Sequence, residues 1–492
     1  MRDWTAHLPQ GMAPGDVDLL ADSSLPGRVE RQWRSRASWP QLRDVDGAWI
    51  SSTELEERTR VAGNRLAGGL QRGDRVVLIA SSSARWLIAY LGALRAGLVV
   101  VPVNPSYTAG EIARIVRHAR PSAAVVAASE HAACVEQAAV GPIKITGVDL
   151  DLPDRGTDEL GAVSGADPAL LIYTSGTTGE PKGALLSHAN LLASATAVGL
   201  AWRWQPDDRL LLALPLFHVH GLGVGFNGAL CAGASVELRA KFDPDDVARH
   251  AVQGVTLFFG VPAMYHRLAA EGVTKALSRL RLLVSGSAPL PATLAHEIKR
   301  QAGQLPLERY GMTETVMLTS NPYEGERKPG TVGFPLPGVQ CRLADDGEVL
   351  VTGPNVIAGY YGRPEADAEA FTAEGWFRTG DLGEVDDDGY LTLVGRSKEL
   401  IITGGFNVYP REVEEVLEAH PDVSEVAVLG RASTRWGEEV TAVVVAARTV
   451  GERALIEYAA QRLAPYKVPK RIEFVQALPR NPLGKLVRQK LK

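Results

Sequence analysis

Short β-branched runs alternate with helix-like segments through the first four hundred residues, and this alternation limits the fold more than any other feature. RVVLIAS (75–81), LVVVPVN (98–104) and AAVVAAS (123–129) each end in a turn-forming residue, and LLLALPLF, VTLFFGVP and RLLVSGSAPL continue the pattern. Strands that are buried on both faces read as continuous apolar runs, as these do. The sequence therefore predicts an α/β fold with a mainly parallel sheet that helices cover.

Two S/T-x-x-E sequences predict where helices of this region begin. Thr53–Glu56 opens LEERTRVAGNRLAGGL, and Thr108–Glu111 opens EIARIVRHAR. In such a capping box the hydroxyl and the glutamate side chain accept hydrogen bonds from main-chain N–H groups that the helix leaves unpaired. We therefore expect each helix to be capped at its threonine.

The character of the sequence changes near residue 340, where short strands and turns follow one another, as in DDGEVLVTGP and DDDGYLTLVGR. We expect a β-rich subdomain over about 330–395. The segments REVEEVLEAH, VSEVAVLG, EVTAVVVA, ALIEYAAQRLA and RIEFVQAL then form a helix–strand–strand–helix–strand pattern of the size of a small α+β domain. We place the boundary at 395–399, between a large N-terminal domain of residues 1–395 and a small C-terminal domain of residues 396–492, which we expect to be mobile.

Charge, cysteines and hydropathy exclude several classes of protein. The chain of 492 residues is long enough for about two to four domains, and its net charge of −5 argues against a nucleic-acid-binding surface. Its three cysteines lie far apart, so we expect neither a disulfide framework nor a zinc knuckle. The longest apolar run, residues 86–103, contains Arg95, which disfavours a membrane span, and the N-terminus lacks a signal-peptide pattern. We expect a cytoplasmic protein that is a monomer or a homodimer.

The stretch YTSGTTGEPKG, residues 173–183, has the composition of an anion-binding loop. Its glycines let main-chain N–H groups turn inward, its hydroxyls add donors, and Lys182 adds a positive charge. A helix-like SHANLLASATAVG follows, so we expect a helix N-terminus close to the loop to add partial positive charge. The spacing differs from that of a Walker motif. A flexible surface hairpin has a similar composition, so the loop needs support from elsewhere in the chain.

Two later stretches supply that support. Arg309–Glu314, RYGMTE, offers an aromatic ring to stack on a base and, in Glu314, the hard oxygen ligand that Mg²⁺ prefers beside phosphates. Phe377–Asp381 ends in a carboxylate that can accept hydrogen bonds from both ribose hydroxyls. Phosphate loop, base platform, metal carboxylate and ribose carboxylate together indicate a nucleotide site built from distant segments.

Five motifs, YTSGTTGEPKG, RYGMTE, GWFRTGD, GRSKELI and PRNPLGK, resemble the core motifs of the adenylate-forming superfamily. They occur in family order between residues 173 and 485 and so cover most of the chain. The superfamily comprises acyl-CoA synthetases, adenylation domains of peptide synthetases and beetle luciferases. The resemblance implies that the protein uses ATP, Mg²⁺ and coenzyme A together with a small-molecule carboxylic acid.

The family pattern implies a role for each matching position. Phosphate, base and nearby contacts would fall at Thr174, Ser175, Gly176, Thr177, Thr178, Gly179, Lys182, Gly286, Ser287, Ala288, Arg309, Tyr310, Gly311, Met312 and Thr313. Asp381 and Arg396 match the ribose contacts, and Thr174 and Glu314 match the positions associated with Mg²⁺. The catalytic positions are Lys485, His218 and Glu314. Lys398 matches the hinge, and Gly404 and Gly405 would let a pantetheine arm pass.

The implied reaction has two steps. The acid attacks the α-phosphate of ATP to form acyl-AMP, while Mg²⁺ and Lys485 offset the repulsion between the two anions. A thiolate then displaces AMP. Because one site does not easily hold both the lysine and the incoming thiol, we expect the C-terminal domain to swing between the steps.

Two of these positions also have simpler interpretations. Lys485 lies near a basic C-terminus, KLVRQKLK, where a lysine is usually solvated, and the motif PRNPLGK is what favours catalysis. His218 and His220 would face one side of a strand, which suggests a metal pair, but no cysteine or carboxylate cluster accompanies them. A structural role for His220 also stays open.

Different segments favour different acids. His218 stands where adenylation domains of peptide synthetases place an aspartate, which disfavours an amino acid. PLFHVHGL, GVPAMYHRL, RLLVSGSAPLP and ERYGMTET resemble malonyl-CoA and short-chain acyl synthetases, whereas GGFNVYPREVEEVL is similar to fatty-acid and medium-chain ligases. A dicarboxylate requires a buried cation, for which Lys241, Arg281 and His266 are candidates. Otherwise an apolar pocket for a monocarboxylic acid would be lined by Phe226, Phe259, Met264 and Met312.

We therefore expect an ATP-dependent carboxylic acid–CoA ligase that acts on a short-chain or malonate-like acid. The alternatives are a medium-chain fatty acid or aromatic acid–CoA ligase, an acyl-AMP ligase that loads a carrier protein, and a non-catalytic nucleotide-binding scaffold. The presence of Lys485, Glu314 and Asp381 argues against the scaffold.

Overall fold

The computed structural model describes residues 1–150, 160–174, 182–403, 406–433, 436–480 and 486–491. The chain forms two compact units. The large unit comprises Arg2–Gln340 and Val351–Phe377, and the small unit comprises Met1, Cys341–Leu350 and Arg378–Lys492. The boundary that we expect at 395–399 falls within the small unit and stays a prediction.

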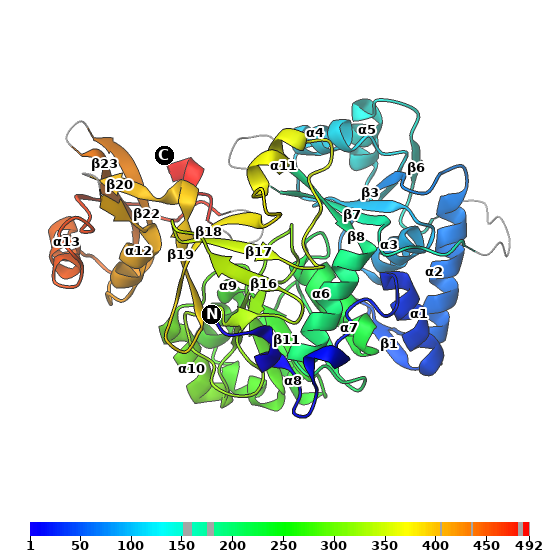
Figure 1. Ribbon diagram of the computed structural model, residues 1–492, viewed down its shortest axis with the longest axis horizontal. Helices are drawn as coiled ribbons and strands as arrows, with labels where there is room; N and C mark the ends of the chain where they lie inside the picture. Colours follow the sequence, from blue (N-terminus) through cyan, green and yellow to red (C-terminus); the bar gives the residue numbers. More distant parts are fainter. Residues whose placement is uncertain (151–159, 175–181, 404–405, 434–435, 481–485, 492) are drawn as a thin grey trace. The chain divides into compact units, whose positions relative to one another are not determined.

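One sheet of the large unit is built from the predicted β-branched runs. Its strand order is β6-β5-β3-β4-β7-β8, with bounds Lys144–Thr146, Ala123–Val126, Arg75–Ile79, Val99–Pro102, Pro168–Thr174 and Lys182–Ser187. The pairs from β6 to β7 are parallel, and β7 and β8 form an antiparallel hairpin. Helices α4 (Ala109–Ala119) and α5 (Ser129–Ala138) cover one face, and α3 (Ala84–Arg95) lies on the other (Figure 1). The predicted helix-covered parallel sheet is therefore confirmed.

The two capping boxes have different outcomes. At α4, the hydroxyl of Thr108 and the carboxylate of Glu111 form the predicted reciprocal pair. At α2 (Ser52–Ala67), the N-cap is Ser51, whose hydroxyl accepts a hydrogen bond from the N–H of Glu54, so the cap predicted at Thr53 is wrong. Serine and threonine both cap helices well, and three hydroxyl residues stand in succession here. The sequence pattern alone does not choose between them.

A second sheet of the large unit has the order β15-β14-β13-β12-β11-β9-β10-β1-β2. In that order the bounds are Phe334–Pro335, Thr319–Ser320, Leu307–Tyr310, Leu282–Ser285, Leu257–Gly260, Arg209–Leu212, Ser235–Leu238, Pro40–Arg43 and Trp49–Ser51. Neighbours from β13 to β1 are parallel. The carboxyl ends of parallel strands meet at one edge, where ligands bind in open α/β folds. That edge presents the segments that follow β9, β12 and β13.

Further helices of the large unit are α1 (Leu25–Ser35), α6 (His188–Ala201), α7 (Asn227–Ala232), α8 (Pro244–Val252), α9 (Pro262–Ala270), α10 (Ala292–Ala302) and α11 (Pro364–Ala370).

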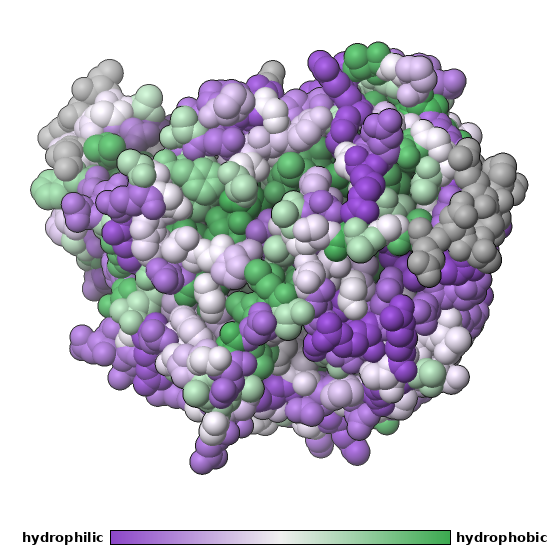
Figure 2. All heavy atoms as spheres, turned by 45° about the vertical axis from the view of Figure 1, so that its right-hand side comes forward, coloured by the Kyte–Doolittle hydropathy of each residue, from purple (hydrophilic) through white to green (hydrophobic). Residues whose placement is uncertain are grey.

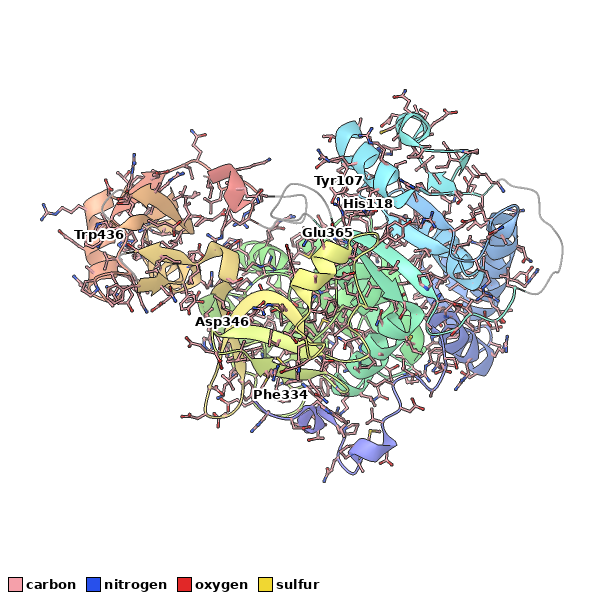
Figure 3. The ribbon with its side chains drawn as sticks, turned by 45° about the horizontal axis from the view of Figure 1, so that its top comes forward. Tyr107, His118, Phe334, Asp346, Glu365 and Trp436 are labelled. Carbon is pink, nitrogen blue, oxygen red and sulfur yellow. The ribbon has the colours of Figure 1, made fainter. Side chains whose placement is uncertain are left out.

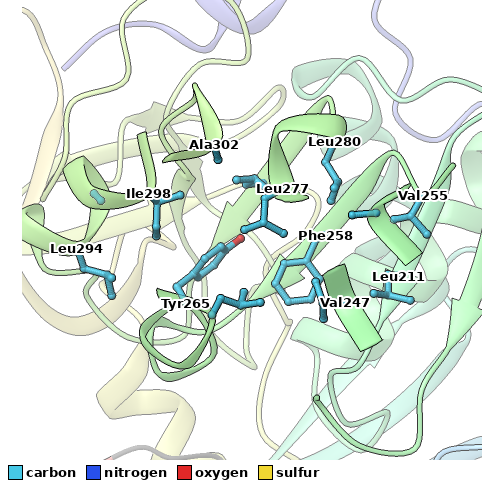
Figure 4. Packing of buried hydrophobic residues seen from close by; sticks show 14 of the residues in the cluster. Leu211, Val247, Val255, Phe258, Tyr265, Leu277, Leu280, Leu294, Ile298 and Ala302 are labelled. Atoms are coloured by element: carbon cyan, nitrogen blue, oxygen red, sulfur yellow. The ribbon is translucent and has the colours of Figure 1, made fainter. Parts of the chain in front are cut away.

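Alternate side chains of the strands in this second sheet enter different layers. Phe258 of β11 packs into the apolar cluster formed with α8, α9 and α10 (Figure 4). The next residue, Phe259, meets the rings of Trp202 and Trp204 edge-on, at centroid distances of 5.3 and 5.8 Å. Burial of both faces explains the unbroken apolar runs in the sequence.

The small unit contains most of one sheet and all of another. The first has the order β16-β17-β18-β19, with bounds Gln340–Leu343, Glu348–Thr352, Phe377–Val385 and Leu391–Arg396. The second has the order β21-β20-β23-β22, with β24 beside β23, and its strands are β20 (Ile401–Thr403), β21 (Phe406–Val408), β22 (Val423–Ser433), β23 (Gly437–Ala446) and β24 (Arg471–Phe474). Helices α12 (Pro410–Glu418) and α13 (Glu452–Ala460) pack their apolar faces on it. The predicted helix–strand–strand–helix–strand order from α12 to β24 is confirmed.

The surface mixes polar and apolar residues, which are interspersed on the face shown in Figure 2. Exposed large apolar side chains include those of Val140 and Val252, and single exposed apolar residues are ordinary in folded proteins. Within the ranges that the structure describes, no helix combines the length and the apolar character needed to cross a membrane.

Candidate active site

The hairpin of β7 and β8 holds both ends of the predicted phosphate loop. Thr174 pairs with Lys182 at the loop end, and Pro168 pairs with Ser187 at the other end. Because α6 begins directly after Ser187, its N-terminus lies about 20 Å of strand away from the loop. The prediction that a helix begins beside the loop is therefore wrong, because strand β8 lies between the loop and α6. The loop residues Ser175, Gly176, Thr177, Thr178 and Gly179 and the side chain of Thr174 lie outside the described residues.

Aromatic contacts anchor both strands of this hairpin near the loop. The hydroxyl of Tyr173 shares a 2.7 Å hydrogen bond with Nδ1 of His118, which lies on α4 (Figure 3). The ring of His118 also meets the rings of Tyr173 and Tyr361 edge-on, at centroid distances of 5.6 and 5.7 Å. On the other strand, Nζ of Lys182 lies 5.3 Å from the ring centroid of Tyr360. The strands that enter and leave the loop are thus tied to α4 and to the segment that precedes α11.

The strand β13 ends in a strained turn that carries RYGMTE. Gly311 has no room for a side chain, because a Cβ there would lie 2.2 Å from the carbonyl oxygen of Val316. Val316 has a φ of +57°, a left-handed conformation that is rare for a β-branched residue. Nδ2 of Asn355 donates to the carbonyls of Thr315 and Met317, at 2.8 and 2.7 Å, and holds the turn. Strain of this kind gathers at functional sites.

Glu314 lies on this turn and is 6% exposed. Its Oε1 accepts a hydrogen bond from the hydroxyl of Tyr360 at 2.9 Å. The Glu314 carboxylate is a hard oxygen donor with about four acceptor sites in all. Carboxylate oxygen is what Mg²⁺ prefers beside phosphates, and Glu314 therefore fits the predicted metal position.

The segment after β12 carries Gly286, Ser287 and Ala288. Ser287 has a φ of +70°, and its hydroxyl lies 3.1 Å from Nδ1 of His220. Ser287 and Ala288 are exposed, so this turn is open to a ligand. His220 begins η3 (His220–Phe226), a π-helical segment, and such segments are frequent at functional sites.

The two histidines of FHVH are neutral at pH 7. Burial lowers the pKa of His218 to about 4. Burial also lowers the pKa of His220, and the nearby Arg309 guanidinium lowers it further. Neither residue lies in a strand, so the expectation that they face one side of a strand is wrong. Across the described ranges, no group of three His, Cys, Asp or Glu side chains is arranged to hold a metal ion.

Arg309, from β13, is a buried cation without a salt-bridge partner in the described residues. It is 5% exposed, and its Nε and Nη2 have no hydrogen-bond partner among those residues. Its guanidinium lies against Gly286, where a Cβ would come within 2.4 Å of Nε. Burial lowers the pKa of Arg309 to about 9, which still leaves it charged at pH 7. A buried unpaired charge is costly, so this position is suited to an anionic ligand.

The three cations considered for a second carboxylate lie elsewhere. Arg281 precedes β12 and Ser287 follows it, so they lie at opposite edges of the sheet. The guanidinium of Arg281 binds Asp208, with Nε 2.7 Å from Oδ1. Lys241 and His266 are exposed. None of the three is placed to neutralise a buried carboxylate beside Ser287.

The predicted apolar lining is placed as follows. Phe226 is fully buried in η3, and Phe259 is enclosed by tryptophan rings, so both are core residues. Met264 is partly buried against the cluster of α8, α9 and α10. Met312, on the turn after β13, is half-buried beside Gly311 and keeps its role as a predicted contact.

In the small unit, Asp381 and Arg396 pair across β18 and β19. Nε of Arg396 lies 2.9 Å from Oδ1 of Asp381, whose side chain is 8% exposed. The arginine thus fixes one oxygen of the predicted ribose carboxylate. Lys398 lies in the short helix that follows Arg396, and its side chain is outside the described part of the chain, as are Gly404, Gly405 and Lys485.

The sequence interpretation missed Tyr360 and Asn355, which hold Glu314 and its turn. Both come from the stretch NVIAGYYGRPEAD, residues 355–367, which has no nucleotide motif of its own. The GYYG–P composition signals a turn before a helix and gives no hint of the partner.

Comparisons with known proteins agree with this arrangement. The family model described as AMP-binding enzyme matches residues 29–361, and the model of the AMP-binding enzyme C-terminal domain matches residues 412–485. The chain is 34% identical to a malonate–CoA ligase of Arabidopsis thaliana, with 86% of this chain and 78% of that protein covered. It is 38% identical to a feruloyl-CoA synthase of an Amycolatopsis species, with 90% and 93% covered. The crystal structure of ATP-bound MatB from Rhodopseudomonas palustris superposes with a TM-score of 0.89 at 38% identity, over 95% of this chain and 98% of that one.

The family match extends over most of the chain, and the structural match extends over both units. YTSGTTGEPKG, RYGMTE and PRNPLGK lie within the residues that the family models match, and GWFRTGD and GRSKELI lie between the two matches. The chain therefore belongs to the AMP-binding enzyme family and is an acyl-CoA synthetase of the adenylate-forming superfamily.

Proposed function

We propose that this acyl-CoA synthetase joins a short dicarboxylic acid to coenzyme A with the use of ATP. The observation that supports this substrate is the guanidinium of Arg309, which is buried and lacks partners for Nε and Nη2 among the described residues. An anion from the substrate would neutralise this cation and satisfy its donors.

The chemistry has two steps. In the first, a carboxylate oxygen of the acid attacks the α-phosphorus of ATP, pyrophosphate leaves, and acyl-AMP forms. We assign the phosphates to the loop between β7 and β8 with Lys182, the ribose to Asp381 with Arg396, and the added positive charge to Lys485. Glu314 would hold Mg²⁺, which would supply positive charge beside the phosphates. In the second step, the thiolate of CoA attacks the acyl carbon and AMP leaves.

The second carboxylate of the substrate distinguishes this proposal from the alternative of an aromatic monocarboxylic acid. A malonate-like acid presents one carboxylate to ATP and the other to Arg309, with the Ser287 hydroxyl and the neutral His220 nearby. The names of relatives do not distinguish the two kinds of acid, because one relative is a malonate–CoA ligase and another is a feruloyl-CoA synthase, at 34% and 38% identity. An aromatic monocarboxylic acid would leave Arg309 buried and unpaired, which is unfavourable.

A panel of acids tests the proposal through pyrophosphate release and acyl-CoA formation. The panel contains malonate, methylmalonate and succinate, together with acetate, butyrate and ferulate. We expect kcat/KM to be at least about a hundredfold higher for a dicarboxylate, because a site with a buried charged donor rejects analogues that leave it unpaired. Arg309→Met should remove this preference, and Lys241→Met should keep it, because Lys241 is exposed.

Other outcomes identify the alternatives. A preference for butyrate or ferulate in the wild-type enzyme would overturn the dicarboxylate proposal in favour of a medium-chain or aromatic acid ligase. Turnover with a holo-carrier protein but none with CoA would indicate an acyl-AMP ligase. The expected cytoplasmic location, and a monomer or homodimer, stay predictions that cell fractionation and light scattering would check.

A further inference from the structure

One short segment contacts both the metal carboxylate and the strand that leaves the phosphate loop. The main-chain oxygen of Glu314 accepts a hydrogen bond from the N–H of Ile357 at 2.9 Å, and three residues later Tyr360 donates its hydroxyl to Oε1 of the same glutamate at 2.9 Å. Main chain and side chain of Glu314 are therefore held by the same stretch of polypeptide. This fixes the position of the residue and the direction of its carboxylate.

The same segment is joined to β8. The N–H of Tyr361 donates to the carbonyl of Gly183 at 2.8 Å, and Tyr360 forms an antiparallel bridge with Ala184. Nζ of Lys182 lies 5.3 Å from the ring centroid of Tyr360, within the range of a cation–π interaction. Tyr360 thus touches, with one side chain, a predicted metal residue and a predicted phosphate residue that are 132 positions apart in the sequence.

The segment is itself fixed by the start of α11. Oδ1 of Asp367 accepts a hydrogen bond from the N–H of Tyr360 at 2.6 Å. The same carboxylate crowds Gly359, where a Cβ would lie 2.7 Å from Oδ2. Tyr360 is therefore held by its main chain, and its hydroxyl has little freedom to leave Glu314.

The protonation state of Tyr360 suits this role. A tyrosine phenol has an ordinary pKa of about 10. The hydroxyl stays protonated at neutral pH and donates to Glu314. Because the donor is neutral, it orients the carboxylate without cancelling the negative charge that a cation needs.

We propose that Tyr360 is a positioning residue, which aims the Glu314 carboxylate at Mg²⁺ and keeps it in register with Lys182. This inference rests on the proposed function, because it needs Glu314 to hold the metal of an adenylation site. A purely structural tyrosine would contribute to stability and leave metal affinity unchanged. The two readings therefore differ in a measurable quantity.

The test compares Tyr360→Phe with Tyr361→Phe, a matched loss of one hydroxyl from the adjacent tyrosine. The ring of Tyr361 lies beside His118 and Arg75 instead of Glu314. Mn²⁺ binding in the presence of a non-hydrolysable ATP analogue, followed by electron paramagnetic resonance, reports the metal site directly. We expect Kd for Mn²⁺ to rise about tenfold in Tyr360→Phe, the effect of losing a hydrogen bond to a charged group, and to change less than twofold in Tyr361→Phe.

Activity gives the second readout. In Tyr360→Phe, the Mg²⁺ concentration for half-maximal pyrophosphate release should rise about tenfold, while the rate at saturating Mg²⁺ returns to at least half of the wild-type rate. In a Glu314→Gln background, adding Tyr360→Phe should weaken Mn²⁺ binding no further, because the oriented carboxylate is already gone. Unchanged Mn²⁺ affinity in Tyr360→Phe, or full additivity with Glu314→Gln, overturns the inference. Mn²⁺ binding needs no acid, so a wrong acid assignment leaves this test intact, whereas wild-type protein that binds no Mn²⁺ with the ATP analogue overturns both proposals.

Discussion

The guanidinium of Arg309 lies directly against the main chain of Gly286, so that a Cβ at residue 286 would be 2.4 Å from Nε and 2.5 Å from Cζ. Such distances are far shorter than van der Waals contact. The glycine is therefore what allows a buried cation to lie beside the turn that carries Ser287. Residue 286 therefore cannot gain a side chain unless the Arg309 guanidinium moves.

Gly286→Ala should displace Arg309 and impair use of the dicarboxylic acid. We expect kcat/KM for the preferred acid to fall about tenfold or more, and the free energy of unfolding to fall by about 1–3 kcal/mol, as for an overpacked core. Steady-state kinetics and urea unfolding measure the two effects. Gly199→Ala is the matched control, because a Cβ on that residue of α6 meets nothing within 4 Å. Wild-type acid preference and stability in Gly286→Ala would show that Arg309 needs no such contact.

Asp381→Asn should weaken nucleotide binding. The substitution keeps the shape of the side chain, but it removes the charge that Arg396 orients at 2.9 Å and that we assign to the ribose hydroxyls. Hydrogen bonds to a charged group contribute about 1.5–3 kcal/mol, so we expect the Kd for AMP to rise about tenfold to a hundredfold. Isothermal titration calorimetry with AMP measures this without any chemical step.

Asp387→Asn is the control for that experiment, because Asp387 lies in the exposed turn between β18 and β19. It should leave the Kd for AMP within twofold of the wild-type value. Equal affinities in Asp381→Asn and the wild type would remove Asp381 from the ribose site and leave it a structural partner of Arg396.

Local patterns predict much of this fold because each depends on nearby residues. The runs at 75–81, 98–104 and 123–129 are apolar between their end residues, and each contains a strand that is buried on both faces. The capping box at Thr108 is correct for the same reason, since its partner is three residues away. The strand β8 was missed because KGALLS follows a polar loop directly and precedes a strong helix, so nothing in its composition marks a separate element.

The sequence does not show which residues that are far apart along the chain contact one another in the fold. Tyr360 reaches Glu314 across 46 positions, and no periodicity connects the two. The motif RYGMTE predicts that Arg309 lies in the site, yet its lack of a partner depends on which side chains fold around it. Arg281 looked equally suitable as a cation, but Asp208, which is 73 positions away, already binds it. Charge can be read from the sequence, whereas pairing and burial cannot.

Lys485→Ala should separate the two half-reactions. We expect acid-dependent pyrophosphate release to fall by roughly two to three orders of magnitude, the scale of losing a preorganised electrostatic contact. Thioester formation from supplied acyl-adenylate and CoA should fall much less, because we assign the lysine to the α-phosphate and carboxylate oxygens of the adenylation step. Single-turnover assays of each half-reaction measure the two effects. Equal losses in both would contradict the two-conformation account of the C-terminal domain.

The buried histidine His188 should make the stability of the protein depend on pH. Burial lowers its pKa from 6.5 to about 4, and neither ring nitrogen has a hydrogen-bond partner among the described residues. Between pH 6.5 and 4 the unfolded chain therefore binds a proton at this residue that the folded protein does not bind. The free energy of unfolding is highest above pH 6.5 and falls as the pH falls through this window, by about 2 kcal/mol from this group between pH 7 and pH 5.

His188→Leu should flatten that dependence, because it removes the titrating group without leaving a hydrogen-bond partner unsatisfied. Urea unfolding at pH 7, 6 and 5 gives the slope for each variant. His266→Asn is the control, since His266 is exposed and its removal should leave the slope as in the wild type. His7 and His218 also have pKa values lowered to about 4 by burial, so some dependence on pH should persist in His188→Leu. An unchanged slope in this variant would mean that His188 binds its proton over the same pH range in the folded and the unfolded protein, and that burial does not shift its pKa.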